Sequence, residues 1–231
     1  MQRIVRTPDG VMLFDDENGM QPDLDCFDPQ WWDNRGRVVQ RYTGRGEAIA
    51  VASAIGVAVL RQYRRGGLPA RMIENRYFYT GSDRCRSFRE WRILDELYRA
   101  GLPVPEPLAA VCRPRGLFYR AALLTRRIDD SHTLLDHLRQ RDGMAAADWQ
   151  ALGRTLARFF AHGLHHPDLN ARNILVDADG GFWLLDLDRA TLAGRPVPAG
   201  RMLARLARSL RKVDLACDTA ALKKGLQQQT G

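Results

Sequence analysis

Lysine is nearly absent from this sequence. Of its 35 lysine and arginine residues, only Lys212, Lys223 and Lys224 are lysines, and all three lie within the last 20 residues. Every earlier cation is an arginine or a histidine. Any chemistry that requires a lysine side chain within the first 211 residues is therefore excluded.

Long hydrophobic runs are also missing. The longest nearly apolar stretch, Ala48 to Leu60, has 13 residues and includes Ser53 and Gly56, whereas a membrane-spanning helix needs about 20. The first ten residues are polar and contain no apolar core of a signal peptide. We therefore expect no transmembrane segment, no secretory signal and a cytoplasmic chain.

Cysteine is sparse and scattered. The four cysteines form neither a CxxC pair nor the closely spaced framework of a small disulfide-rich domain, and we predict reduced thiols in the core: Cys26, Cys85, Cys112 and Cys217. With 45% hydrophobic and 27% charged residues, the 231-residue chain has the composition of a globular protein. Disorder, collagen and coiled coil are excluded.

Positive charge is in excess. The formal net charge of +8 favours an anionic partner, which charge alone leaves open among nucleic acid, a phosphorylated substrate and an acidic membrane. Neither a zinc finger nor an aromatic RNA-binding motif is present, so no nucleic-acid partner is expected.

Residues 1–127 have the pattern of a small sheet lobe. One amphipathic helix, Ser87 to Ala100, interrupts the strands and places Phe88, Trp91, Leu94 or Asp95, and Tyr98 at helical spacing. The strand-like runs, separated by glycine and proline, are Val38 to Tyr42, Ala48 to Val51, Val57 to Tyr63, Leu108 to Cys112, and Leu117 to Thr125. We predict an antiparallel sheet with one helix.

Residues 128–231 are mostly helical in pattern, so the whole chain is predicted to be α+β with two lobes. Ser131 is the expected N-cap of a helix from Thr133 to Arg139. A second helix, Ala146 to His162, has an apolar stripe formed by Trp149, Leu152, Leu156 and Phe159. Two short strands, Ile174 to Val176 and Phe182 to Leu185, flank a glycine-containing turn and predict a β-hairpin.

Polar residues bracket this hairpin at both ends. The segment His166 to Asn173 precedes it, and Asp186-Leu187-Asp188 follows it. Because a hairpin brings its two ends together, Asp168, Asn173 and Asp186 are expected to converge. Two carboxylates and an amide oxygen suit a hard divalent cation such as Mg²⁺, which leaves coordination positions for phosphate oxygens.

Two other interpretations of these residues remain. Taken singly, Asp168 and Asn173 are typical of turns, and Asp186 is typical of a strand end. A zinc site is a second alternative, because His162, His165, His166 and Asp168 lie close together in the sequence, although no HExxH motif or cysteine ligand pattern accompanies them.

The segment from His166 to Asp186 resembles the protein-kinase-like superfamily. Its catalytic loop reads H-R-D-L-x-x-x-N, and His166, Asp168, Leu169 and Asn173 match this spacing. The resemblance implies a two-lobed protein-kinase-like fold in which Asp168 accepts the proton of the acceptor hydroxyl, while Asn173 and Asp186 bind metal. Asp186-Leu187-Asp188 replaces D-F-G, as in small-molecule kinases of the aminoglycoside-phosphotransferase type.

The first lobe contains the other parts that such a kinase needs. Gly44 and Gly46 lie in a turn between two predicted strands, where backbone N–H groups can bind phosphate, although glycine is common in hairpin turns. The phrase Ala58-Val59-Leu60-Arg61 is similar to the superfamily's V-A-I-K, so the resemblance places Arg61 at the phosphate-binding lysine. It also makes Glu90 the partner of Arg61, the alternative for Glu90 being a solvated helix residue.

Residues 27–212 resemble the lipopolysaccharide core kinases, and within them the 3-deoxy-D-manno-octulosonic acid (Kdo) kinases. The phrases that carry this similarity are TGRG from Thr43, LRQYRRGGL from Leu60, GLPVP from Gly101 and DLNARNIL from Asp168. The family implies ATP- and Mg²⁺-dependent phosphorylation of position 4 of Kdo on a Kdo-lipid A precursor. It also implies a peripheral position on the cytoplasmic face of the inner membrane of a Gram-negative bacterium.

Other functions stay open at this point. The chain could be a related phosphotransferase that acts on a heptose of the core, on a soluble small molecule or on a protein. A non-catalytic pseudokinase is disfavoured, because Asp168, Asn173 and Asp186 are all present. Acceptor contacts are expected from arginines of the first lobe, with four candidates: Arg64, Arg65, Arg71 and Arg76.

The segment Arg201 to Lys212 predicts a basic amphipathic helix. Leu203, Leu206 and Leu210 share one face, and the cations Arg201, Arg205, Arg208 and Lys212 share another. This pattern fits an ordinary helix with a solvated charged face. It also fits a helix whose cations lie toward an anionic membrane surface.

Overall fold

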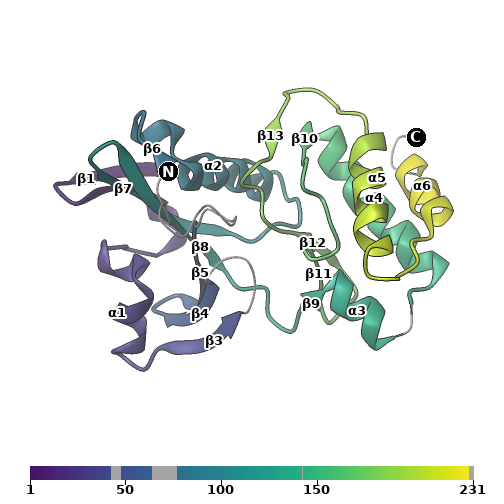
Figure 1. Cartoon of the computed structure of the whole chain (residues 1–231), viewed down its shortest axis with the longest axis horizontal. Helices are drawn as coiled ribbons and strands as arrows, with labels where there is room; N and C mark the ends of the chain where they lie inside the picture. The colour runs from purple at the N-terminus through teal and green to yellow at the C-terminus, as the bar shows by residue number, and fades with distance from the viewer. Residues whose placement is uncertain (43–47, 64–76, 142, 229–231) are drawn as a thin grey trace. The chain divides into compact units, whose positions relative to one another are not determined.

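The computed structural model describes residues 1–42, 48–63, 77–141 and 143–228 (Figure 1). The fold is α+β, as predicted, and the chain divides into two compact units. The first unit comprises Met1–Asp95 and Glu106–Arg127, and the second comprises Glu96–Pro105 and Ile128–Gly231. The sequence prediction divided the chain between residues 127 and 128 and so assigned the segment Glu96–Pro105 to the first lobe.

An eight-stranded sheet forms the first unit. Its order is β1-β2-β7-β8-β5-β4-β3, with β6 also pairing with β8, and all neighbours are antiparallel (Figure 1). The strands are β1 (Gln2–Thr7), β2 (Gly10–Asp15), β3 (Val38–Tyr42), β4 (Ala48–Ser53), β5 (Gly56–Gln62), β6 (Tyr77–Phe78), β7 (Pro107–Arg115) and β8 (Phe118–Arg126). The five strands predicted from the sequence are therefore confirmed, with small shifts of their ends.

Helices pack against this sheet. Phe27 in the 3-10 helix η2 (Asp25–Phe27) and Trp32 in α1 (Pro29–Asp33) are buried in one core cluster with residues of β4, β5 and β8. The helix α2 (Arg86–Arg99) begins at β7, where the Ser87 hydroxyl donates to the Val111 carbonyl at 2.8 Å. Two further 3-10 turns are η1 (Asp16–Asn18) and η4 (Ser82–Arg84).

Within its described residues, the second unit contains the end of α2, four further helices and five short strands. The helices are α3 (Leu134–Gln140), α4 (Ala146–Ala161), α5 (Gly200–Arg211) and α6 (Thr219–Gln227). The strands are β9 (His132–Thr133), β10 (Leu164–His165), β11 (Ile174–Val176), β12 (Phe182–Leu184) and β13 (Thr191–Leu192). The predicted stripe of α4 is buried, and the predicted hairpin is the antiparallel pair β11–β12.

Glycines allow α4 and α6 to pack closely. A Cβ atom placed on Gly153 would lie 2.2 Å from the Leu222 carbonyl oxygen, and one on Gly225 would lie 2.0 Å from the Gln150 carbonyl oxygen. Both distances are far below van der Waals contact. Any side chain at either position would push these helices apart.

Tyr98, which lies on α2 as predicted, is 45% exposed, while Leu97 is buried. Two local predictions were wrong, the N-cap of α3 and the burial of one cysteine. The N-cap of α3 is Thr133, whose hydroxyl oxygen accepts from the Asp136 N–H at 3.1 Å, whereas Ser131 bonds back to Ile128. Of the four cysteines, all of which are free, Cys217 is only partly buried.

Candidate functional site

The hairpin β11–β12 brings the polar residues at its two ends together. Ile174 pairs with Leu184 and Val176 with Phe182. Beyond the last pair, the Leu185 N–H donates to the Asn173 carbonyl oxygen at 2.8 Å. Because Asp186 directly follows Leu185, Asp186 and Asn173 lie at the same end of the hairpin. These two residues therefore converge, as the hairpin predicted.

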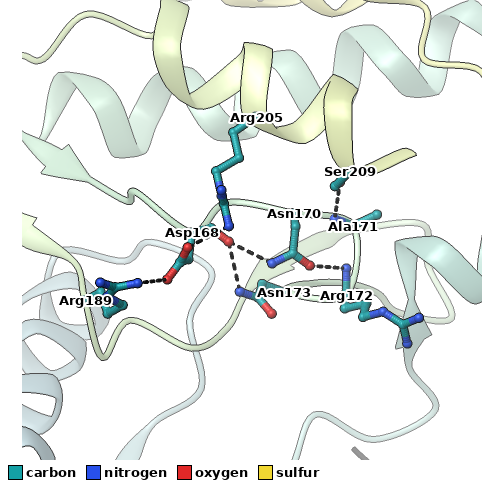
Figure 2. A network of polar contacts seen from close by, with 8 residues as sticks. All are labelled: Asp168, Asn170, Ala171, Arg172, Asn173, Arg189, Arg205 and Ser209. Carbon is teal, nitrogen blue, oxygen red and sulfur yellow. Dashed lines mark hydrogen bonds and ion pairs between the residues drawn. The ribbon is translucent and has the colours of Figure 1, made fainter. Parts of the chain in front are cut away.

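Two asparagine side chains fix the loop that precedes the hairpin. The Asp168 carbonyl oxygen accepts from Asn170 Nδ2 at 2.7 Å and from Asn173 Nδ2 at 3.2 Å (Figure 2). Leu169 is fully buried, and the Ala171 N–H donates to Ser209 Oγ at 3.3 Å, which ties the loop to α5. The loop is therefore fixed both by its own hydrogen bonds and by its contact with α5. The Asn173 amide oxygen points away from Asp168 (Figure 2).

The carboxylate of Asp168 is held by two arginines (Figure 2). Arg205 Nη2 on α5 lies 2.7 Å from Asp168 Oδ1, and Arg189 Nη1 lies 3.2 Å from Asp168 Oδ2. The Asp168 side chain is 29% exposed, so both ion pairs lie at the surface of the second unit rather than in its core. Neither arginine was predicted from the sequence as a partner of Asp168.

Asp186 has an unusual backbone conformation. Its φ angle of 56° lies in the left-handed region, which is rare for residues other than glycine and most accessible to asparagine and aspartate. The next residue, Leu187, is fully buried, whereas Asp186 is exposed. The replacement of D-F-G by Asp186-Leu187-Asp188 thus keeps an apolar anchor in the core directly after the aspartate.

His166 is a buried structural residue. Its side chain is 1% exposed, and its Nε2 lies 3.3 Å from the Leu185 carbonyl oxygen. Burial lowers the pKa of His166, so the imidazole is neutral at pH 7 and donates from Nε2. This bond holds the residue before Asp186 in place.

The same geometry argues against the zinc interpretation. His162 lies 3.5 Å from Glu96, and His166 is turned into the core. Among the described residues, no three histidine, cysteine, aspartate or glutamate side chains are grouped closely enough to hold a metal ion. Any cation at the hairpin would therefore rely on the amide oxygen of Asn173 in addition to carboxylates.

In the first unit, Arg61 on β5 forms an ion pair with Glu90 on α2. The Glu90 side chain is 2% exposed, so its interpretation as a solvated helix residue was wrong. A buried carboxylate requires partners, and Glu90 accepts from both Arg61 and the Tyr63 hydroxyl. Arg61 Nη2 also lies 3.2 Å from Tyr63 Oη, and its guanidinium stacks over the Tyr63 ring.

The expected effect of Arg61→Lys follows from this three-residue cluster. The planar guanidinium contacts both Glu90 and Tyr63, and its fork of N–H donors has a geometry that an ammonium group does not reproduce. A lysine ammonium would have to divide its contacts between Glu90 and phosphate. We expect kcat/KM for ATP to fall about 10-fold or more, since a charged hydrogen bond contributes about 1.5–3 kcal/mol.

Steady-state kinetics at varied ATP would measure this effect. Arg92→Lys is the matched control, because Arg92 lies on α2 and pairs at 2.7 Å with the exposed Asp83. Wild-type KM and kcat in Arg61→Lys would show that only the positive charge at position 61 matters.

Several predicted site residues lie outside the described part of the chain. They are Gly44 and Gly46 of the glycine-rich turn and the four candidate acceptor arginines Arg64, Arg65, Arg71 and Arg76. The roles assigned to them stay predictions from the sequence.

The predicted amphipathic helix is α5. Leu203, Leu206 and Leu210 are buried, as expected, and the arginines are exposed. However, Arg205 from the middle of the cationic face contacts Asp168. This face therefore lies beside the loop that contains Asp168.

Four residues that contact the predicted site residues were not predicted from the sequence, and the sequence pattern indicates a position near the site for only one of them. Tyr63 follows Arg61 by two positions, which places both side chains on one face of an extended chain. Arg189 and Arg205 lie 21 and 37 residues after Asp168, at separations to which no local periodicity applies. From the sequence alone, Asn170 is a typical turn residue, and nothing indicates that its side chain donates to the Asp168 carbonyl oxygen.

Comparison with known proteins relates this chain to one protein family. The sequence model of the lipopolysaccharide kinase (Kdo/WaaP) family matches residues 29–225. A protein named 3-deoxy-D-manno-octulosonic acid kinase from Xanthomonas oryzae pv. oryzae (strain PXO99A) is 48% identical over 208 residues, which cover 88% of this chain and 81% of that protein. Proteins of the same name from Xanthomonas campestris pv. campestris (strain B100) and Xylella fastidiosa (strain 9a5c) are 47% and 44% identical, over 88% and 89% of this chain and 81% and 82% of their own lengths.

No helix within the described ranges has both the length and the apolar character needed to cross a bilayer. The family match covers most of the chain, with parts of both units and every described candidate residue. The chain belongs to the lipopolysaccharide kinase (Kdo/WaaP) family.

Proposed function

We propose that this protein phosphorylates the hydroxyl at position 4 of Kdo on a Kdo-lipid A precursor, with ATP as phosphate donor. The proposal rests on one observation above all: relatives named Kdo kinases share 44–48% identity with a chain that has Asp168, Asn173 and Asp186 around one hairpin. The same residues argue against a pseudokinase.

The proposed reaction is a direct transfer. The oxygen of the acceptor hydroxyl attacks the γ-phosphorus of ATP, an O–P bond forms, and the bond from that phosphorus to the β–γ bridging oxygen breaks to release ADP. The hydroxyl proton passes to the carboxylate of Asp168. Since the transition state is loose, the carboxylate serves mainly to orient the hydroxyl and to receive its proton.

Asn173 and Asp186 fit Mg²⁺. The Asn173 amide nitrogen is engaged with the Asp168 carbonyl, so its amide oxygen is the atom that faces outward. Asp186 adds a carboxylate at the same end of the hairpin, and an all-oxygen donor set suits a hard cation. When bound, Mg²⁺ would neutralise charge on the ATP phosphate oxygens.

Arg61 is proposed to bind the nucleotide phosphates, with Glu90 and Tyr63 fixing its direction. The ion pair with the buried Glu90 supports this role, because it fixes the orientation of a planar guanidinium, a group whose geometry suits phosphate oxygens. Gly44 and Gly46 would add backbone N–H donors.

An acceptor comparison tests the function. Purified protein is incubated with ATP and Mg²⁺ and, in parallel, with Kdo-lipid A precursor, a heptose-containing core acceptor, an aminoglycoside and a generic protein substrate. Transfer to the Kdo acceptor, located at position 4 by NMR, is the expected result. Preferential transfer to the heptose, the aminoglycoside or the protein would replace the proposal by the corresponding alternative.

We also propose that the protein acts as a peripheral protein at the cytoplasmic face of the inner membrane. Its acceptor is a lipid, and α5 carries the exposed Arg201 and Arg208 on either side of Arg205. An anionic leaflet attracts basic residues by about 1 kcal/mol each. Because Arg205 contacts Asp168, membrane binding is assigned to the outer two arginines.

The double variant Arg201→Gln/Arg208→Gln should bind anionic liposomes about 10- to 30-fold more weakly, since about 2 kcal/mol of attraction is removed. Cosedimentation measures this affinity. Activity on a detergent-dispersed acceptor should stay normal. The variant Arg154→Gln/Lys224→Gln, which removes the same charge from exposed positions of α4 and α6, is the control. Equal liposome binding by all three proteins would leave α5 an ordinary surface helix.

A further inference from the structure

We propose that Arg189 and Arg205 bind the carboxylate of the acceptor sugar, and that they rest on Asp168 until the acceptor arrives. This inference rests on the proposed function, because it names the group of the Kdo acceptor that the site recognises. It starts from the two ion pairs of Figure 2, in which one arginine contacts each oxygen of Asp168.

The two arginines are positioned by different parts of the fold. Arg205 lies one helical turn before Ser209, whose hydroxyl oxygen accepts from the Ala171 N–H at 3.3 Å. Arg189 is followed by the buried Ala190, whose N–H donates to the Leu187 carbonyl at 2.9 Å. Both guanidinium groups are thus brought to Asp168 from well-anchored backbone.

The contact with Asp168 engages only part of each guanidinium group. Each contact involves a single terminal nitrogen, while a guanidinium has five N–H donors. The Arg189 and Arg205 side chains are 70% and 46% exposed. They can therefore reach a second anion beside Asp168 with little rearrangement.

The chemistry of the acceptor requires such cations. A sugar acid brings a carboxylate close to its acceptor hydroxyl, and this hydroxyl must come within hydrogen-bond distance of Asp168. Asp168 and Asp186 would repel the incoming carboxylate. Two arginines at the same place turn this repulsion into attraction, and a bidentate guanidinium–carboxylate contact adds direction.

Transfer of the arginines to the acceptor would also release Asp168. In the free protein both carboxylate oxygens are engaged by arginines. When the acceptor carboxylate takes over these donors, the Asp168 oxygens are open to contact with the acceptor hydroxyl. An uncharged sugar would leave Asp168 paired, so the arginines select acidic acceptors.

The test compares two acceptors, the Kdo-lipid A precursor and its Kdo methyl ester, both dispersed in detergent so that membrane binding plays no part. Wild type should prefer the free carboxylate by about 10- to 100-fold in kcat/KM, the range of a charged hydrogen bond. In Arg205→Gln and Arg189→Gln this preference should shrink to a few-fold, while KM for ATP stays unchanged. Arg205→Lys should recover part of it.

Arg211→Gln is the matched control, because Arg211 is an exposed arginine at the end of the same helix. It should keep the full preference. The inference is overturned if both Gln variants retain the wild-type preference, or if they raise KM for ATP with the preference intact, which would assign the arginines to the nucleotide. If wild type phosphorylates neither Kdo acceptor but does phosphorylate another acceptor, the proposed function itself has failed.

Discussion

Asp168→Asn is expected to lower kcat on the Kdo acceptor by about 10²- to 10⁴-fold, the usual contribution of a general base. Asparagine keeps the shape of the side chain but cannot take up the hydroxyl proton. The backbone carbonyl of residue 168, which accepts from Asn170 and Asn173, is unaffected by the substitution. The loop should therefore keep its conformation.

Stability and nucleotide binding should change little. The substitution removes two ion pairs, with Arg189 and Arg205, but their arginine partners are 70% and 46% exposed. Surface ion pairs of this kind contribute about 0–1 kcal/mol. Because the lost carboxylate is assigned to the acceptor and not to ATP, Mg²⁺–nucleotide affinity should stay near that of wild type.

Three measurements check this expectation: kcat with saturating acceptor, nucleotide affinity by calorimetry, and thermal unfolding. Asp179→Asn serves as the control, because Asp179 is an exposed residue in the turn of the β11–β12 hairpin. A near-normal kcat for Asp168→Asn would remove Asp168 from its assigned role.

The position of this site could be predicted because its residues are close in sequence. Asp168, Asn173 and Asp186 are joined by one short hairpin, and two short apolar runs on either side of a glycine-containing turn indicate such a hairpin. The strands β3 to β5 and the helices α2 and α4 were likewise evident from their periodicity.

The contacts that complete the site could not be predicted in this way. Arg205 reaches Asp168 from α5, and in the sequence it is one of four cations on the polar face of a helix. Which of these cations faces a carboxylate depends on how α5 packs, and periodicity gives only the face. The burial of Glu90 depends in the same way on the sheet beneath α2.

The hairpin β1–β2 and the helix α1 were not predicted from the sequence, for a different reason. The hairpin of β1 and β2 was not predicted, because β1 is mostly exposed and therefore lacks a continuous apolar pattern. The short helix α1 spans only Pro29–Asp33, which is too short for a periodic signal. Both are stabilised by contacts with the sheet rather than by local preference.

Asp186→Asn is the second substitution with a large expected effect, and its structural cost should be small. The left-handed backbone at residue 186, with φ of 56°, is one that asparagine adopts readily. Alanine would add strain at this position, so asparagine is the variant that isolates the charge. Leu187 would keep its buried position.

The expected result is a lower turnover together with a need for higher Mg²⁺ concentrations. Removal of one of the proposed metal ligands should lower kcat at least about 100-fold, because a metal ion contributes several kcal/mol to charge stabilisation in the transition state. Affinity for Mg²⁺–ATP should fall, and high Mg²⁺ should restore part of the rate. Without Mg²⁺, the variant should bind ATP at least as well as wild type, since one negative charge near the phosphates has gone.

Two measurements check these effects on Asp186→Asn: reaction rates at varied Mg²⁺ and fixed ATP, and nucleotide titrations in the presence and absence of the ion. Asp179→Asn is again the control. An unchanged Mg²⁺ profile in Asp186→Asn would place the metal ligand elsewhere in the chain.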